Sequence, residues 1–338
     1  MSLYYGNTKI GSLYLGSDKI KEAYYGNVKV FGSGSSLAPY TMRFRFGSSA
    51  TDPTTVEWEN PHMAECWTKV ESITDDNVWD FHDESSDWSG YFAGVFIDDG
   101  FDILDANLTG VTQINGMFAS SGIASISNFY TPDITECASL FNGCTSLWRV
   151  SLFDTSNVTD MTEMFSECTS LESVPLFDTS NVTDMSYMFA ACTSLKYVPL
   201  FDTSSVAYMS SMFYGCLSLK SVPLFDTSSV DSMTYMFNGC TSLESAPLFN
   251  TSSVTTMLNM FNGCSSLTSI PLFNTANVTD MASMFQGCEN VETGALALYQ
   301  QASTQATPPS SHSKTFRDCG SNTTTGAAEL AQIPNDWQ

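Results

Sequence analysis

A cysteine recurs at a fixed spacing of 24 residues over residues 144–288 of this chain. The seven cysteines stand with no insertion or deletion between them, at Cys144, Cys168, Cys192, Cys216, Cys240, Cys264 and Cys288. A fixed period of roughly 20–50 residues is typical of repeats that stack as coils, in which each repeat buries its apolar face against its neighbours. The spacing therefore predicts a repeat solenoid with one coil for every 24 residues.

Each repeat also contains apolar residues that predict the interior of a coil. In one copy the predicted inward-facing residues are Leu171, Val174, Leu176, Val182, Met185, Met188 and Phe189. Aligned Met-Phe pairs extend the repeat to eight coils, from Met117 to Phe285. The sequence leaves open whether the phenylalanine column from Phe153 to Phe273 is exposed or buried. Alternation along a strand exposes it if Leu176 points inward, whereas Pro175 could break the strand and let both side chains pack inside.

The repeated cysteines are expected to form a ladder of buried thiols. Equivalent side chains in stacked coils point the same way, about 4.8 Å apart. Seven is an odd number, so a complete set of disulfides is disfavoured. No Cys-x-x-Cys pair occurs, and His62, His82 and His312 are scattered, so neither a metal site nor a cofactor is predicted.

Acidic residues recur in two further columns, at Asp154, Asp178, Asp202 and Asp226, and at Asp160 and Asp184. Asn250 and Asn274 continue the first column without a charge, which favours turn capping, because an Asp or Asn side chain accepts hydrogen bonds from nearby amides. Calcium held between columns is the alternative, and catalysis is the least favoured hypothesis. The chain has no P-loop, dinucleotide fingerprint, G-x-S-x-G or H-E-x-x-H motif, so no catalytic residue is predicted.

The composition changes along the chain and predicts five regions. Three Gly-centred units ten residues apart indicate a small antiparallel β-meander of about four strands. A Gly/Ser-rich linker follows, and four tryptophans mark a mixed α/β cap. The predicted regions are the meander at 1–31, the linker at 32–39, the N-terminal cap at 40–104, the repeats at 105–292 and a C-terminal cap at 293–338, with helices at 295–303 and 324–334 around a loop at 307–313.

The charge balance restricts the partners. The chain has 12 basic against 36 acidic residues, for a net charge of −24. Nucleic acid and anionic membrane both require a cationic surface, so neither is expected as a partner. No apolar run is long enough to insert into a membrane, and the first residues do not read as a signal peptide. We therefore expect a protein that stays in the cytoplasm or is released by lysis.

Positions that change from coil to coil predict a binding surface, because constant positions build the coils. Aromatic and Arg side chains on a surface rich in Ser and Thr are common anchors of recognition. The alternative is neutral drift on a solvated face. The candidate ligand-binding residues are Trp148, Arg149, Glu172, Tyr187, Lys196, Tyr197, Tyr208, Lys220 and Tyr235.

The repeated phrases resemble a known family. "MFNGCTSLESAPLFNTSSVTTM" and "LFDTSNVTDMSYMF" look like BspA-like leucine-rich repeats of bacterial surface and phage-associated proteins, over about residues 105–290. The resemblance implies a leucine-rich-repeat-like solenoid, which is a right-handed parallel β ladder with short helical turns and a ligand-binding flank. The opening "YYGNTKIGSLYLGSDKI" is similar to short N-terminal modules of gut bacteriophage tail proteins.

Together these features predict a non-enzymatic phage or prophage tail-associated protein in the virion tail. Its repeats would bind a host-surface glycan or protein, and residues 1–31 would contact other tail proteins or form a homo-oligomer such as a trimer. The first alternative is an adhesin of the BspA-like family at the bacterial cell surface. A polysaccharide depolymerase is a weaker alternative.

Overall fold

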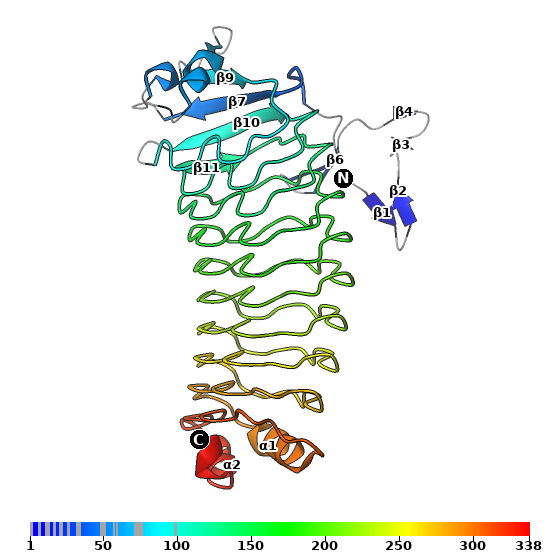
Figure 1. Cartoon of the computed structure of the whole chain (residues 1–338), viewed down its shortest axis with the longest axis vertical. Coiled ribbons are helices and arrows are strands. Elements are labelled where there is room, and N and C mark those ends of the chain that lie inside the picture. Colours follow the sequence, from blue (N-terminus) through cyan, green and yellow to red (C-terminus); the bar gives the residue numbers. More distant parts are fainter. Residues whose placement is uncertain are drawn as a thin grey trace.

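The computed structural model describes residues 35–47, 52–56, 58, 60–70, 77–97 and 100–338 in full, together with the backbone of six short strands before residue 32. A stack of coils forms the body of the protein. A β-sheet covers its N-terminal end and two helices cover its C-terminal end (Figure 1). None of the helices in the described part of the chain is long and apolar enough to cross a membrane.

The first six strands pair as three separate antiparallel hairpins. Each pairing joins two strands that flank a Gly-containing turn sequence, so the ten-residue period counts pairs of strands and not single strands. The predicted meander of about four strands is therefore corrected to three hairpins. These are β1 (Leu3–Tyr5) with β2 (Thr8–Ile10), β3 (Tyr14–Leu15) with β4 (Asp18–Lys19), and β5 (Ala23–Tyr25) with β6 (Val28–Phe31).

The N-terminal cap is a five-stranded sheet in the order β11-β10-β7-β9-β8. All neighbours are antiparallel except β10 and β11. The helical segments described between residues 40 and 104 are 3-10 helices, so the predicted mixed α/β cap is a β cap. Its elements are β7 (Thr41–Phe46), η1 (Pro53–Thr55), η2 (Pro61–Cys66), β8 (Trp67–Lys69), β9 (Val78–His82), β10 (Phe101–Asn107) and β11 (Ile123–Ile126).

Aromatic side chains hold this cap together. The Phe44 ring lies 4.8 Å from Trp67 and 5.0 Å from Phe92. Three of the four tryptophans in the cap are buried, and Trp79 is half-buried. The predicted boundary at residue 104 falls within β10, because β10 pairs with β7 on one side and with β11 of the first coils on the other. The sheet is therefore continuous with the coil stack.

Backbone hydrogen bonds join each coil to the next. In the turn segment of one coil, 184–192, the Met185 amide donates to the Tyr208 carbonyl at 2.9 Å, and the Phe189 amide donates to the Met212 carbonyl at 2.9 Å. Parallel bridges also link equivalent positions, such as Asp184 and Tyr208. Residues 127–294 contain turns and no helix, so the predicted short helical turns are turns without helix.

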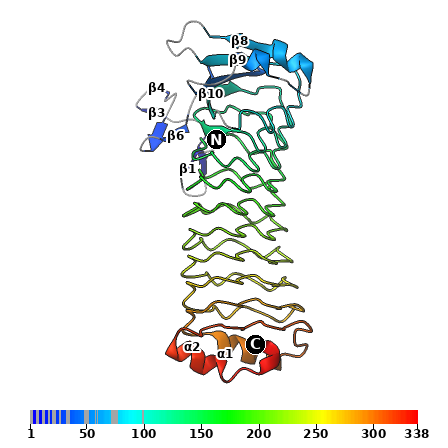
Figure 2. The same cartoon turned by 90° about the vertical axis from the view of Figure 1, so that its left-hand side faces the viewer.

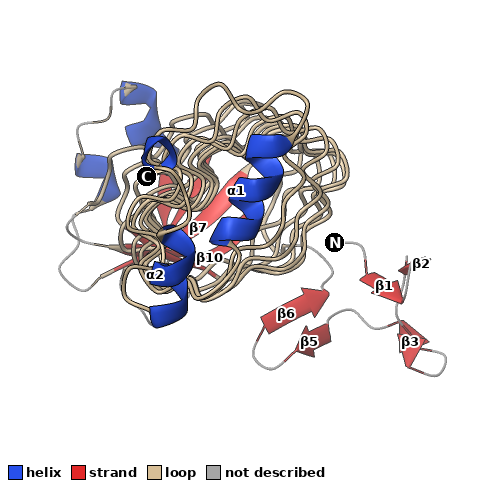
Figure 3. Cartoon of the chain, turned by 90° about the horizontal axis from the view of Figure 1, so that it is seen from below, coloured by secondary structure: helices blue, strands red, loops and turns tan. Residues whose placement is uncertain are grey.

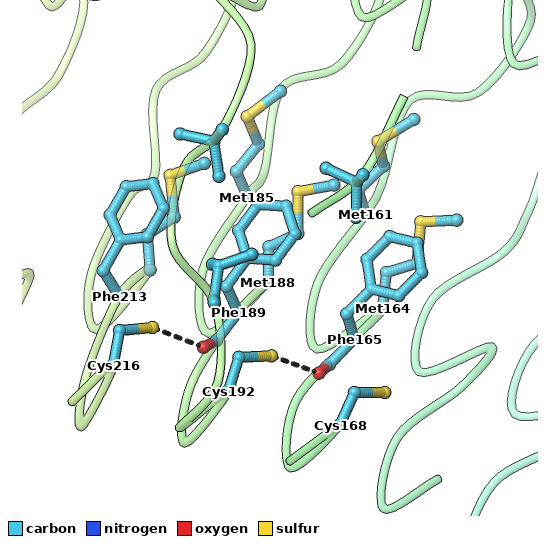
Figure 4. Packing of buried hydrophobic residues seen from close by; sticks show 14 of the residues in the cluster. Met161, Met164, Phe165, Cys168, Met185, Met188, Phe189, Cys192, Phe213 and Cys216 are labelled. Carbon is cyan, nitrogen blue, oxygen red and sulfur yellow. Dashed lines mark hydrogen bonds between the residues drawn. The ribbon is translucent and has the colours of Figure 1, made fainter. Parts of the chain in front are cut away.

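A continuous column of phenylalanine rings runs through the interior. Neighbouring centroids lie 5.3–6.0 Å apart with nearly parallel planes. Methionine side chains pack beside the rings (Figure 4). The column exceeds the eight predicted coils at both ends, at Phe92 and Phe316. Its members are Phe92, Phe118, Phe141, Phe165, Phe189, Phe213, Phe237, Phe261, Phe285 and Phe316.

The extended segment of each coil, 171–177 in one copy, turns one predicted core residue outward. Leu171 and Val174 are buried as predicted, but the Leu176 side chain is exposed. The Phe177 amide donates to the Pro175 carbonyl at 3.0 Å, which closes a three-residue turn. This turn breaks strand alternation, so Leu176 points to solvent and Phe177 points inward. The inward assignment of Leu176 was therefore wrong, and the column from Phe153 to Phe273 is buried.

The C-terminal end is closed by α1 (Ala295–Thr304), α2 (Thr324–Leu330) and the 3-10 helix η3 (Asn335–Trp337). Figures 2 and 3 show α1 and α2 lying across the last coil. The two predicted helices are present. The predicted loop at 307–313 ends in a further turn of the stack, because the Met281 amide donates to the Ser311 carbonyl at 2.8 Å and Phe285 does so to Thr315 at 2.8 Å.

Candidate functional site

Each coil has two opposite faces. Side chains from the turn segment and the extended segment meet inside the same coil, where the Phe165 and Phe177 rings lie 6.0 Å apart and those of Phe213 and Phe225 lie 6.3 Å apart. Side chains that point outward from the two segments must therefore lie on opposite sides of the stack. We call these sides the leucine face, on the extended segments, and the tyrosine face, on the turn segments.

A column of exposed leucines runs along the leucine face. Its five members are between 52% and 59% exposed, at Leu176, Leu200, Leu224, Leu248 and Leu272. Adjacent coils in a parallel ladder are about 4.8 Å apart, so neighbouring leucines lie in contact range. Trp148 and Tyr197 add exposed aromatic rings to the same face. The result is a straight apolar surface on an ordered backbone.

Charged residues beside the leucines pair with each other from coil to coil. The Lys196 ammonium lies 2.7 Å from the Glu172 carboxylate, and the Lys220 ammonium lies 2.8 Å from that of Glu244. The hydrogen bond to Glu244 and its charge raise the pKa of Lys220. Three of the predicted ligand-binding residues are thus in exposed ion pairs, which leaves no net charge on this part of the face.

The tyrosine face holds the other predicted residues. Tyr187 and Tyr208 are exposed and Tyr235 is half-buried. The Tyr235 ring lies 6.5 Å from that of Tyr214, with an edge-on arrangement. Tyr187 and Tyr235 both have left-handed backbone, with φ of 58° and 57°. The structure therefore divides the predicted set: Trp148, Arg149, Glu172, Lys196, Tyr197 and Lys220 lie on extended segments, and Tyr187, Tyr208 and Tyr235 lie on turn segments.

The repeated cysteines lie inside the stack and have no part in either face. All seven are free thiols and buried. Each thiol donates to the backbone carbonyl of a phenylalanine in the preceding coil, as Cys192 does to Phe165 at 2.9 Å and Cys216 to Phe189 at 3.1 Å (Figure 4). Burial raises the pKa of Cys240 to about 12. These thiols are protonated and unreactive at neutral pH.

The two aspartate columns cap turns. The Asp178 carboxylate accepts from the Ser180 hydroxyl at 2.7 Å, and the Asp184 carboxylate accepts from the Ser186 amide at 2.8 Å. Asn250 makes the same contact to Ser252 with its side-chain oxygen, 2.8 Å from the hydroxyl. The hydrogen bonds from Ser228 lower the pKa of Asp226. The turn-capping interpretation agrees with these contacts.

Two features were missed in the sequence. The leucine column was assigned to the interior, although the proline before each leucine was a signal that strand alternation would fail. The second is a group of metal-binding side chain types in the N-terminal cap. Within the described residues, His62, Cys66 and Asp83 bring three potential ligand atoms within 4.8 Å of one another. They are 21 residues apart in sequence at most, and only the sheet brings them together.

Comparison with solved structures finds two leucine-rich repeat proteins. The leucine-rich repeat protein from T. pallidum is 23% identical, with a TM-score of 0.37, and the match covers 50% of this chain and 83% of that chain. A leucine-rich repeat protein from Eubacterium ventriosum is 18% identical, with a TM-score of 0.39, and covers 70% of this chain and 68% of that one. No match was found among curated proteins.

A family model matches the coil region. Its description is "Mycoplasma protein of unknown function, DUF285", and it matches residues 89–197, 112–223 and 197–297. Together these matches span 89–297, which is more than half of the chain and corresponds to the coil stack. The model does not reach residues 1–31, so it provides no support for the similarity of that segment to phage tail modules. By this match the chain belongs to the DUF285 family.

Proposed function

We propose that this protein is a non-enzymatic binding protein of the adhesin type, which attaches to a protein partner through its leucine face. The observation that carries the proposal is the column of five leucines, all more than half exposed along one side of the coil stack. Contiguous apolar surface of this kind is uncommon on a protein that works alone, and it marks sites of association.

The chemistry of the face favours a protein over a glycan. Leucine offers apolar area and no hydrogen bond, whereas a sugar needs polar partners for its hydroxyls as well as an apolar platform. The flanking lysines and glutamates are already paired with each other, so they act as a neutral polar rim. An apolar centre with a polar rim is the usual anatomy of a protein–protein interface.

The repeat architecture suits this role. In this proposal the coils act as a leucine-rich-repeat-like solenoid of the BspA-like type, which holds a long surface rigid at little entropic cost on binding. The aspartates of the coils are engaged in turn capping, which supports a binding role over hydrolysis. A surface location on a bacterial cell is part of the proposal, and the partner is a protein of a host or of a neighbouring cell.

Residues 1–31 have a separate part. Hairpins of two short strands have little core of their own, and we propose that they associate with a partner or with further copies of the chain. Attachment to a phage tail has no support in the comparisons and is not included in the proposed function.

The experiment compares two double variants of the full-length protein. Leu200→Ser/Leu224→Ser removes the centre of the leucine face, and Tyr187→Ser/Tyr208→Ser is the matched control on the tyrosine face. Binding is measured on arrays of immobilised extracellular proteins and of glycans. We expect the parent to bind a protein on the array. The affinity should fall at least tenfold in the leucine variant, or by about 1.4 kcal/mol, and should be unchanged in the tyrosine variant. Glycan binding lost only in the tyrosine variant would refute the proposal.

A further inference from the structure

The N-terminal cap contains a cluster of three side chains with different donor atoms. His62 and Cys66 lie four residues apart in η2, and Asp83 follows directly after β9. Cys66 is buried, Asp83 is half-buried and His62 is exposed. The cluster therefore lies at the surface of the cap, open to solvent on the histidine side. It is remote in sequence from the coils that carry the proposed function.

The donor atoms have separations close to those that a small metal ion requires. The Cys66 Sγ lies 3.6 Å from His62 Nε2, and His62 Nε2 lies 4.0 Å from Asp83 Oδ2. A tetrahedral zinc ion with bonds of about 2.0–2.3 Å holds its ligand atoms about 3.4–3.6 Å apart. The Cys66 sulfur and the Asp83 carboxylate lie within 4.8 Å of each other, so closure around an ion needs the donor atoms to approach one another by about 1 Å.

The surrounding structure orients these side chains. The Asn60 side chain caps η2 by accepting from the His62 amide at 3.1 Å. The Asp83 carboxylate accepts from the Ser85 amide at 2.9 Å and from the Tyr91 hydroxyl at 3.4 Å. The two contacts to Asp83 are typical of metal sites, because they fix the direction of the carboxylate before an ion arrives, and the cap at Asn60 fixes the start of the helix that carries His62 and Cys66.

The donor set selects the metal. One sulfur, one imidazole nitrogen and one carboxylate oxygen suit zinc, whereas magnesium and calcium take oxygen ligands. The neighbouring Glu65 carboxylate lies 3.9 Å from His62 Nδ1 and adds negative charge at the open side. We propose that His62, Cys66 and Asp83 bind a zinc ion, with water in the fourth position, and that the ion fastens η2 to the end of β9.

A simpler interpretation is a capped helix end with no metal. The Cys66 thiol lies 3.4 Å from the His62 carbonyl, to which it can donate. That contact explains the position of the cysteine alone. It does not explain why the Cys66 sulfur and the Asp83 carboxylate both face His62 Nε2, and zinc binding accounts for all three.

The test uses the full-length protein after dialysis against a chelator. Zinc is titrated against a chromophoric competitor, and cobalt is used as a spectroscopic substitute. We expect one equivalent of tightly bound metal and a thiolate-to-cobalt charge-transfer band. Cys66→Ser should abolish the band, and Asp83→Asn should keep it while the affinity falls at least tenfold.

The matched control is His82→Gln, since His82 is adjacent to Asp83 in sequence but its ring contacts Thr41 at 3.0 Å and not the cluster. This variant should bind zinc like the parent. Circular dichroism checks that each variant is folded. The proposal is overturned if the folded parent protein binds no zinc, or if Cys66→Ser binds it with unchanged affinity and stoichiometry.

Discussion

The Cys192 thiol donates to the backbone carbonyl oxygen of Phe165, 2.9 Å away in the preceding coil. The same contact recurs through the stack, so each of these buried carbonyls accepts a second hydrogen bond from a thiol of the next coil, beside the one from the cysteine amide of its own coil. This relationship explains why a polar-tipped small residue stands at this position in every full repeat, and it links the period of the sequence to the stability of the fold.

The cysteine ladder should make stability sensitive to alkaline pH. The pKa of Cys240 is raised to about 12 in the folded chain, whereas an unfolded thiol has a pKa of about 8.5. As pH rises above the lower value, the unfolded chain loses protons that the folded chain keeps, so the free energy of unfolding falls. We expect a Tm that is flat between about pH 7 and pH 8.5 and declines above that range.

The matched variant for that experiment is Cys240→Ala. This variant lacks one thiol whose pKa is raised by folding. The decrease of its unfolding free energy with pH should therefore be smaller by about 1.4 kcal/mol per pH unit between the two pKa values. Urea unfolding at several pH values measures this difference. An identical pH dependence in the parent and the variant would show that Cys240 is not held as a buried thiol.

Two leucines in one coil should respond differently to truncation. Leu195 is fully buried and Leu200 is 59% exposed. Leu195→Ala should cost about 2–5 kcal/mol, because it opens a cavity between coils. Leu200→Ala should change the free energy of unfolding by about 0.5 kcal/mol or less. Chemical denaturation of both variants measures the contrast, and equal costs would contradict the outward direction of Leu200.

A glycine recurs at Gly215, Gly239, Gly263 and Gly287. This position has room for a side chain, but its backbone conformation disfavours one. Gly239 has a φ of 74°, and an added Cβ would meet only the Gly215 backbone at 3.7 Å, an ordinary contact. Gly239→Ala should therefore destabilise by about 1–2 kcal/mol through left-handed backbone strain alone. Ala191 occupies the equivalent position in an earlier coil, with a φ of 56°. Ala191→Gly is therefore the reciprocal variant and should not destabilise the protein. Thermal melts compare the two, and a loss in Ala191→Gly as large as in Gly239→Ala would argue against strain.

The aspartate column should accept asparagine but not alanine. The Asp226 carboxylate accepts from the Ser228 hydroxyl at 2.7 Å. In a later coil, the side-chain oxygen of Asn274 accepts from the backbone amide of Ala276 at 3.0 Å. Asp226→Asn should be close to neutral at pH 7, and Asp226→Ala should cost about 0.5–1.5 kcal/mol. Since the pKa of Asp226 is lowered, the stabilisation by the charged form is present above the ordinary carboxyl pKa and is lost as pH falls below it.

Much of the coil was determined by the sequence alone. A constant period of 24 residues requires equivalent positions to stack, so the cysteines, Met185, Met188 and Phe189 had to lie on one shared interior. The Asp or Asn before each turn could be identified as a cap for the same local reason. The terminal helices were also predictable, because helix formation depends on neighbouring residues.

The tertiary structure decided what local patterns leave open. Phe92 and Phe316 join the column at spacings of 26 and 31 residues, from Phe118 and Phe285. Those spacings break the period, so only stacking reveals them. The convergence of His62 and Asp83 depends on the antiparallel pairing of β8 with β9. The direction of Leu176 was decided by the turn between Pro175 and Phe177: it places the larger aromatic ring in the core against Phe165 and leaves the leucine to solvent.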